Sequence, residues 1–168
     1  KYGLTNKEIE DRFKKLIRYS EPEKGKPTLF IWPEGVFSGY SFDEILVYKN
    51  LISSNFSDDH YIITGVNKLE PETGQFYNSM IILNNKFEII QSYNKRKLVP
   101  FGEFLPFEDL LSKLGFKKST EGYGSFLRGE KNNNIKVVNL NILPLICYEV
   151  IFTDLIQKSD EKTNLIVN

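Results

Sequence analysis

The chain has 168 residues, enough for one domain that buries about two-thirds of the surface its unfolded form exposes. Lys and Arg together number 22, as do Asp and Glu, which argues against the net basic surface that nucleic-acid binding requires. Aromatic residues make up 14% of the chain, and this composition favours a packed globular domain over a disordered one.

One cysteine is present, so no intramolecular disulfide can form and the redox compartment is left open. No apolar run reaches the roughly 18 residues of a membrane-spanning helix. The first residues, Lys-Tyr-Gly, resemble neither an initiator methionine nor a signal peptide. We therefore expect a processed or excised segment.

A helix is expected near the N-terminus, where Thr5 and Glu8 have the spacing of a capping box and apolar residues then recur every three or four positions. A short apolar strand at residues 28–32 follows. Pro33 ends this strand and leaves Glu34 just beyond its carboxyl end. Ligands of open α/β sheets bind beyond such ends, so Glu34 is a candidate site residue.

The middle of the chain is expected to hold a helix, with Asp43 as its N-cap, and then three strands. The Asn84-Asn85 pair tolerates positive φ and favours a hairpin between the second and third of these strands. The strand-like runs cover residues 61–66, 75–83 and 86–91.

Residues 93–106 contain two prolines together with Lys95 and Glu103, and we expect them to form a loop. The remaining expected elements are a helix at residues 108–114, an exposed stretch at 115–134, a hairpin of residues 135–138 and 140–146, and a strand at 164–167.

Cys147 lies at the end of an apolar strand-like run and precedes residues 150–157, where apolar side chains recur at helical spacing. A strand-to-helix turn would place its sulfur near a helix N-terminus, whose free N–H groups and dipole stabilise a thiolate. Cys147 is therefore a candidate nucleophile. The alternative is a buried cysteine that packs as a small apolar side chain.

Glu34, Lys95 and Cys147 together supply the three functions that acyl transfer requires. A thiolate attacks the carbonyl carbon, a carboxylate accepts and returns protons, and an ammonium stabilises the oxyanion. No histidine is needed. The single histidine, His60, is expected to be a solvated loop residue rather than a base.

Three motifs resemble, in order and context, the Glu-Lys-Cys motifs of the nitrilase superfamily: Trp-Pro-Glu at 32–34, Tyr-Asn-Lys at 93–95 and Cys-Tyr-Glu at 147–149. Within it, the run Leu-Val-Pro-Phe-Gly-Glu-Phe-Leu-Pro at 98–106 is most similar to the apolipoprotein N-acyltransferase family. The resemblance spans essentially the whole chain. It implies an α/β fold, a nitrilase-like αββα sandwich incomplete at the C-terminus, with residues 1–168 as a partial catalytic domain.

The resemblance implies that Glu34 is the general base, Lys95 the oxyanion-stabilising ammonium and Cys147 the nucleophile. Glu103 would orient the lysine or assist the base, and Glu149 would be an essential supporting carboxylate. The residues alone leave two alternatives open. Glu103 is equally well explained as one half of a surface ion pair, and Glu149 as a favourable first-turn carboxylate at a helix N-terminus.

Aromatic residues flank the candidate catalytic residues in the sequence. These aromatic residues are either part of the core or form the wall of an acyl-chain groove or a membrane-facing lip. The set comprises Phe37, Tyr40, Phe42, Phe101, Phe104 and Phe107. For Trp32 the core is favoured over ligand contact. The substrate-binding candidates are Trp32, Phe37, Tyr40, Phe101, Phe104 and Tyr148.

The family reaction implied is a ping-pong transfer without metal or cofactor. Cys147 takes an acyl chain from a phospholipid as a thioester, and the α-amino group of a diacylglyceryl-cysteine lipoprotein then accepts it. Family members hold this domain on the periplasmic side of the bacterial inner membrane between transmembrane helices, which this chain lacks. They also continue beyond the end of this chain, so we expect weak or absent activity from the segment alone.

Two other functions are compatible with the same residues. A soluble nitrilase-type amidase would use Glu34, Lys95 and Cys147 to pass the acyl group of a small amide to water. A non-catalytic interaction module would retain the fold without the reaction. Acylation of Cys147 by a phospholipid or by a small amide distinguishes these possibilities.

Overall fold

The computed structural model describes residues 5–37, 39–107, 124–130, 134–157 and 160–168. The expected helix at 108–114 and the exposed stretch that follows it to residue 123 lie outside these ranges. In chain order the elements, with η for a 3-10 helix, are α1 (Asn6–Ser20), β1 (Thr28–Ile31), α2 (Phe42–Ile45), η1 (Leu46–Tyr48), α3 (Lys49–Asn55), β2 (His60–Leu69), β3 (Phe76–Leu83), β4 (Ile89–Asn94), β5 (Ile135–Val137), β6 (Leu140–Pro144), η2 (Cys147–Ile151), α5 (Thr153–Gln157) and β7 (Leu165–Val167).

The strands form two sheets. In the first, β1 pairs in parallel with β2, and β2, β3 and β4 follow as an antiparallel meander. In the second, β5 and β6 form the expected hairpin and β7 pairs in parallel with β6. Because β1 and β4 run in the same direction, their carboxyl ends point to the same end of the first sheet, with β2 and β3 between them.

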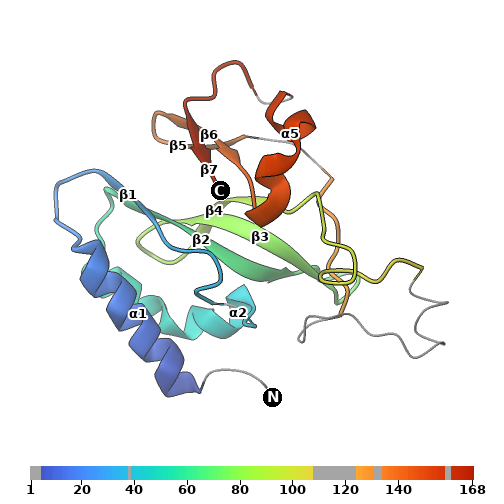
Figure 1. Cartoon of the computed structure of the whole chain (residues 1–168). Helices are drawn as coiled ribbons and strands as arrows, with labels where there is room; N and C mark the ends of the chain where they lie inside the picture. The colour runs from blue at the N-terminus through green and yellow to red at the C-terminus, as the bar shows by residue number, and fades with distance from the viewer. Residues whose placement is uncertain (1–4, 38, 108–123, 131–133, 158–159) are drawn as a thin grey trace.

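The layers stack in the order helix, sheet, sheet, helix, as Figure 1 shows. The N-terminal helices cover one face of the first sheet, and the second sheet packs on its other face. On the outer side of the second sheet, Leu155 of α5 packs against Leu143 and Leu145. This arrangement is the expected αββα sandwich.

Strand β2 contributes side chains to two hydrophobic clusters, one beneath the helices and one between the sheets. Successive side chains of a strand point to opposite faces, so Ile62 and Val66 join the cluster beneath the helices while Ile63 joins the cluster between the sheets. In the helix-facing cluster, Phe13 of α1 packs edge-on against Trp32 with ring centroids 6.2 Å apart. Trp32 is 5% exposed, so its predicted place in the core is confirmed.

The expected N-cap of the second helical segment and the expected turn conformation between β3 and β4 both differ from the structure. Ser41, not Asp43, caps the second helical segment, because the Ser41 hydroxyl accepts from the Glu44 N–H while the Glu44 carboxylate accepts from the Ser41 N–H at 2.8 Å. In the β3–β4 turn the positive φ, 63°, falls on Phe87 rather than on either asparagine. Asn84 instead closes the turn through its side-chain oxygen, which accepts two backbone N–H groups.

His60 is buried rather than solvated, so the expectation of a solvated loop residue was wrong. Its ring, 1% exposed, packs edge-on against Phe30 at 5.3 Å and Phe56 at 5.9 Å. Nδ1 accepts from the Ser57 N–H at 3.1 Å, and Nε2 lies 3.0 Å from the Glu23 carbonyl oxygen. These partners replace water, so His60 is a structural residue that joins the start of β2 to the loop before β1.

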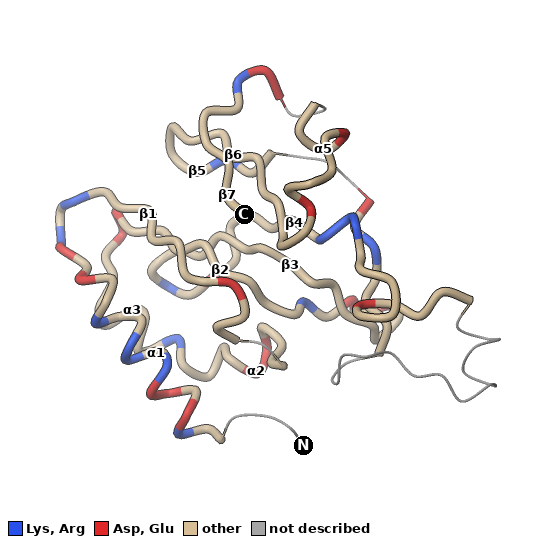
Figure 2. Tube along the Cα trace, in the orientation of Figure 1, with Lys and Arg blue, Asp and Glu red and all other residues tan. Residues whose placement is uncertain are grey.

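Charges of both signs are interspersed along α1 and over the loops (Figure 2). This distribution agrees with the equal numbers of basic and acidic residues in the chain. In the described part of the chain, no helix combines the length and the apolar character needed to span a bilayer.

Candidate active site

The three candidate reactive residues follow three different strands. Glu34 and Lys95 lie just beyond the carboxyl ends of β1 and β4, the two outer strands of the first sheet, and Cys147 follows β6 of the second sheet. A pocket of about 260 Å³ lies where the two sheets meet, and Glu34, Glu103 and Cys147 all line it. Apolar side chains from both sheets form much of its remaining wall, among them Ile31, Ile63, Met80, Leu145 and Ile146.

Lys95 is almost completely buried, with 1% of its side chain exposed. Its ammonium donates to Glu103 Oε1 at 2.9 Å, and the Glu103 side chain is 13% exposed. A buried ammonium persists only with a partner of opposite charge, so this pair is required by the burial of the lysine. Glu103 is therefore not half of a surface ion pair. It lines the pocket and binds the Lys95 ammonium, although Lys95 itself is not among the described lining residues.

The Glu103 carboxylate is held on three sides. Besides the Lys95 ammonium, Oε1 accepts from Asn78 Nδ2 at 2.9 Å and Oε2 accepts from the Val99 N–H at 2.9 Å. Asn78 lies on β3 and also lines the pocket. These bonds fix the carboxylate, and through it the lysine, at the pocket wall.

The segment at 124–130 supports the same two residues through their backbones. The Gly129 N–H donates to the Lys95 carbonyl oxygen, and the Phe126 N–H donates to the Glu103 carbonyl oxygen, each at 2.8 Å. On the opposite side, the Lys95 N–H donates to the Asn78 carbonyl oxygen at 2.8 Å. The loop that carries the lysine is thus held between strand β3 and this segment.

Cys147 is the first residue of η2 and is partly exposed. Its φ of 56° lies in the left-handed region, where a non-glycine residue is strained by about 1–2 kcal/mol. The single helix expected at 150–157 is wrong: η2 ends at Ile151, Phe152 is extended, and α5 begins at Thr153. Val150 and Ile151 are 44% and 66% exposed, so their apolar spacing does not mark a buried helix face.

Glu149 is fully buried and joins the two sheets through its carboxylate. Its carboxylate accepts from the backbone N–H groups of Arg96, Lys97 and Ile146 at 2.7, 3.0 and 2.9 Å. A fourth donor is the Tyr93 hydroxyl at 3.0 Å. Because Ile146 precedes Cys147 and Arg96 follows Lys95, this one carboxylate links the backbone of the candidate nucleophile to that of the candidate oxyanion-stabilising residue. Glu149 is thus a first-turn carboxylate of η2 that also binds donors from the first sheet and its following loop.

The Tyr93 hydroxyl stays protonated in this environment. Burial, and then the neighbouring Glu149 carboxylate, raise the pKa of Tyr93 far above its ordinary value. The neutral hydroxyl can therefore act as a hydrogen-bond donor to Glu149 over the whole physiological pH range.

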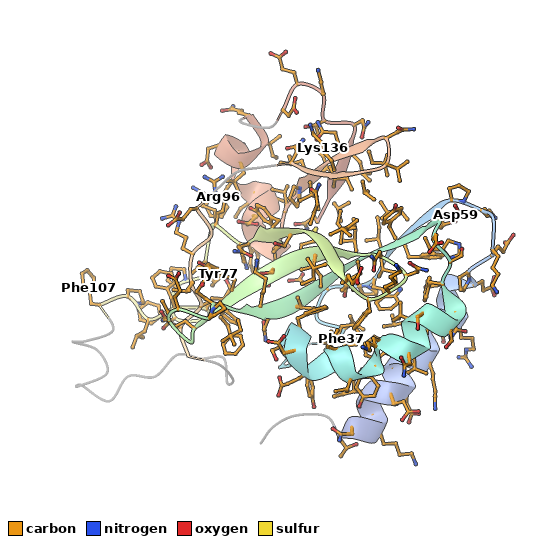
Figure 3. All side chains as sticks on the ribbon, turned by 180° about the vertical axis from the view of Figure 1, so that it is seen from behind. Phe37, Asp59, Tyr77, Arg96, Phe107 and Lys136 are labelled. Atoms are coloured by element: carbon orange, nitrogen blue, oxygen red, sulfur yellow. The ribbon has the colours of Figure 1, made fainter. Side chains whose placement is uncertain are left out.

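The substrate-binding candidates occupy different surroundings. Trp32 and Phe37 line the pocket while belonging to the helix-facing core, and Figure 3 shows Phe37 between the helices and the first sheet. Four others do not line the pocket in the described part of the chain: Tyr40 and Phe104 are half-buried, and Phe101 and Tyr148 are 50% and 61% exposed. Their substrate role stays a prediction. Of the two further aromatic residues, Phe42 packs against the helix-facing core and Phe107 is 83% exposed, projecting from the loop in Figure 3.

Sequence reasoning missed Asn78, which positions Glu103, and Thr64, which lines the pocket. Asparagine is depleted in strands, so Asn78 near the start of an apolar strand was a usable but weak indication. Within the described ranges, no three His, Cys, Asp or Glu side chains gather as a metal site would require.

Comparisons with solved structures identify the fold. An amidase from Nesterenkonia sp. AN1 aligns with 98% of this chain and 61% of its own, with a TM-score of 0.59 and 18% identity. Saccharomyces cerevisiae Nit3, a member of branch 10 of the nitrilase superfamily, aligns with 91% of this chain and 55% of its own, with a TM-score of 0.55 and 20% identity. The αββα sandwich is therefore the nitrilase fold.

Sequence comparisons identify the family. Curated apolipoprotein N-acyltransferases from Rhizobium leguminosarum bv. trifolii and Rhodopseudomonas palustris are 34% and 35% identical to this chain, over 88% and 84% of its length. The chain spans less than a third of each relative, 29% and 27%. The sequence model for carbon-nitrogen hydrolases matches residues 5–168. From its first helix to its last residue, this chain belongs to the carbon-nitrogen hydrolase family.

Proposed function

We propose that this chain is the acyl-transfer domain of an apolipoprotein N-acyltransferase. In this proposal an acyl chain passes from a membrane phospholipid to Cys147 and then to the α-amino group of a diacylglyceryl-cysteine lipoprotein. The reaction takes place at the outer face of the bacterial inner membrane, with membrane contact made by parts of the protein outside this chain. Similarity to the curated N-acyltransferases supports this choice over other carbon-nitrogen hydrolases.

The observation that carries the proposal is the pocket shared by Glu34, Glu103 and Cys147, with Lys95 paired to Glu103 at 2.9 Å. A thiol, a carboxylate and a buried ammonium are the groups that covalent acyl transfer needs. They come from separate strands, so their proximity is a property of the fold rather than of local sequence.

The first half-reaction forms a thioester. Glu34 accepts the thiol proton of Cys147 as the sulfur attacks the ester carbonyl carbon, and Lys95 stabilises the resulting oxyanion. When the tetrahedral intermediate collapses, the carbon–oxygen bond to the glycerol breaks. Glu34 returns its proton to the leaving oxygen, and lysophospholipid is released.

The second half-reaction forms an amide. The lipoprotein amine attacks the thioester carbonyl carbon and gives a proton to Glu34. The carbon–sulfur bond then breaks, and the Cys147 thiolate recovers that proton from Glu34. The enzyme returns to its starting state with the acyl chain on nitrogen, so two easier steps replace one difficult transfer.

Glu103 and Glu149 serve as positioning residues in this scheme. The Glu103 carboxylate is occupied by Lys95, Asn78 and Val99, which favours orientation of the lysine over service as a second base. Glu149 is occupied by four donors and holds the backbones on either side of the site.

The proposal is tested by mass spectrometry of the full-length protein after incubation with phospholipid vesicles. We expect one acyl chain on Cys147, released by a diacylglyceryl-cysteinyl peptide. Cys147→Ala abolishes the adduct, and Glu34→Gln slows its formation about 10²–10⁴-fold, the usual contribution of a general base. Glu72→Gln, at an exposed surface position, is the matched control and leaves the rate unchanged.

Two results would replace the proposal. An adduct that forms from a small amide but not from phospholipid, and that water releases, identifies an amidase. A Cys147 that fails to react even with iodoacetamide identifies a non-catalytic module.

A further inference from the structure

Gly65 lies inside strand β2, where a glycine weakens the sheet because it has no side chain to pack. Its backbone does not require a glycine, since Gly65 is not one of the glycines with positive φ. Packing does not require one either. Apart from its chain neighbours, a β-carbon added at Gly65 would find a single described atom within 4 Å, the Ser79 carbonyl oxygen at 4.0 Å. A strand glycine of this kind often marks the close approach of a ligand.

The open space at Gly65 faces the second sheet. Side chains alternate along a strand, and Ile63 belongs to the cluster between the sheets whereas Val66 belongs to the helix-facing cluster. Gly65 comes two positions after Ile63, so a side chain there would point between the sheets. Met80, its partner on β3, belongs to the same cluster, and Cys147 packs against that cluster. The space therefore lies on the face of the first sheet against which Cys147 packs.

This space belongs to the pocket that Glu34 and Cys147 line. Gly65 lines the pocket with them and is partly exposed, whereas Thr64 and Val66 on either side of it are 1% and 4% exposed. The missing side chain thus leaves room within the pocket, whose volume is about 260 Å³, rather than a gap that neighbouring side chains fill.

The pocket wall changes from apolar to polar along this face of β2. Ile63, which precedes Gly65 on the face, is apolar, whereas Asn67, which follows it, is paired with Asn78 of β3. Asn78 in turn donates to Glu103. A carbonyl group suits the polar part of this wall and a hydrocarbon chain suits the apolar part. An acyl group bound along the wall would therefore pass over Gly65.

We propose that Gly65 is a specificity-determining residue, whose missing side chain leaves room beside Cys147 for the hydrocarbon chain of the acyl donor. This inference rests on the acyl transfer proposed above but not on the donor being a phospholipid, because any ester with a long acyl chain carries the same hydrocarbon. A side chain at position 65 would exclude a long chain and spare an acetyl group, which extends only one methyl group beyond the carbonyl carbon.

The decisive experiment compares p-nitrophenyl octanoate with p-nitrophenyl acetate as donors to the full-length protein. With either ester, the Cys147 sulfur attacks the carbonyl carbon, the bond to the phenol oxygen breaks, and p-nitrophenolate leaves while Glu34 passes the thiol proton to solvent. Release of p-nitrophenolate, corrected with Cys147→Ala, gives the second-order rate constant of acylation. Mass spectrometry confirms the acyl group on Cys147.

Gly65→Val should lower the octanoate-to-acetate ratio of these rate constants about 10–200-fold, and Gly65→Ala about 3–10-fold. The melting temperature should stay the same or rise in both variants, because the new side chains suit a strand better than glycine and enter open space. Gly124→Val is the matched control. A β-carbon there would also meet nothing within 4 Å, but Gly124 is not among the described lining residues, so both rate constants should be unchanged.

Equal slowing of both esters in Gly65→Val would overturn the assignment of Gly65, because a distorted site loses both reactions. An unchanged ratio, or a wild-type protein that accepts the acetate ester but not the octanoate ester, would overturn it as well. Phosphatidylethanolamine vesicles are the third donor. If the vesicles fail with the wild-type protein while the octanoate ester succeeds, the lipid proposal is wrong and the ester ratio still decides the role of Gly65. Failure of all three donors would overturn both proposals.

Discussion

Gly129 and Asn94 are in such close contact that no side chain fits between them. A β-carbon added at Gly129 would lie 2.8 Å from the Asn94 carbonyl carbon and closer still to its oxygen. Asn94 directly precedes Lys95, and the Gly129 N–H bonds to the Lys95 carbonyl oxygen at 2.8 Å. The glycine therefore determines how closely the segment at 124–130 packs against the proposed oxyanion-stabilising lysine.

Gly129→Ala should displace this segment, because the atoms in the way are backbone and cannot rotate aside. We expect a loss of about 1–3 kcal/mol in the free energy of unfolding, typical of overpacking, and a larger proportional loss of Cys147 acylation. Urea denaturation and the acylation assay measure the two effects. Gly124→Ala is the matched control, since its β-carbon would meet nothing within 4 Å. Equal behaviour of the two variants would show that the contact is unimportant.

Glu103→Gln leaves the Lys95 ammonium buried without its carboxylate. We expect the free energy of unfolding to fall by about 3 kcal/mol, the lower end for a broken buried pair because Glu103 is 13% exposed. Acylation should fall about 10²–10³-fold as the ammonium loses its position. The control is Glu10→Gln, which breaks the exposed Lys14–Glu10 pair and should cost at most about 1 kcal/mol. If both variants lost a similarly small free energy of unfolding, the Lys95–Glu103 pair would not have the stabilising role proposed for it.

Glu149→Gln tests the carboxylate that joins the two sheets. A glutamine has one acceptor oxygen and would direct its NH₂ group at N–H donors, so about 3–5 kcal/mol of stability should be lost. Acylation should fall with it, since the backbones next to Lys95 and Cys147 both move. Tyr93→Phe removes only one of the four donors and should cost about 1–3 kcal/mol. Chemical denaturation measures the free energy of unfolding of both variants. A larger loss in Tyr93→Phe than in Glu149→Gln would contradict the proposed role of the Glu149 carboxylate in joining the two sheets.

The raised pKa of Tyr93 predicts how the free energy of unfolding changes at alkaline pH. Its pKa in the fold is raised above the ordinary value of 10.0 by burial and by Glu149. The folded protein therefore keeps a proton that the unfolded chain releases, so the contribution to stability is complete below about pH 10 and is lost as the pH rises further. Above that pH, Tyr93 alone contributes a slope of up to about 1.36 kcal/mol per pH unit.

Tyr93→Phe should lose stability less steeply than wild type between about pH 10 and 11. Urea denaturation at several pH values in that interval gives the dependence of the free energy of unfolding on pH for wild type and for Tyr93→Phe. Tyr19→Phe, at a tyrosine that is 67% exposed, should keep the wild-type slope. Parallel curves for wild type and Tyr93→Phe would mean that the hydroxyl is not held neutral in the fold.

Much of the fold follows from local patterns in the sequence. The capping box of Thr5 and Glu8 begins α1 as expected, and Pro33 ends the first strand region before Glu34. Motif order also placed Cys147 beyond a strand. These features depend on residues within a few positions of one another, which is the range over which propensity and capping act.

The remaining features depend on partners distant in the sequence. Asn78 contacts Glu103, 25 positions away, and Glu149 contacts Tyr93, 56 positions away, so neither role could be derived from its neighbours. His60 is a second case in which residues distant in the sequence decide the environment of a side chain. Its polar local context predicted solvent exposure, whereas Phe30 and Phe56, brought together by the fold, bury it.

Cys147 follows a strand of the second sheet, whereas Glu34 and Lys95 follow strands of the first. In the proposed mechanism the thiol acts only beside these two residues, so the sheets must close on one another before Cys147 can be acylated. A newly made chain would therefore gain the proposed activity only after its last strands have joined the sandwich.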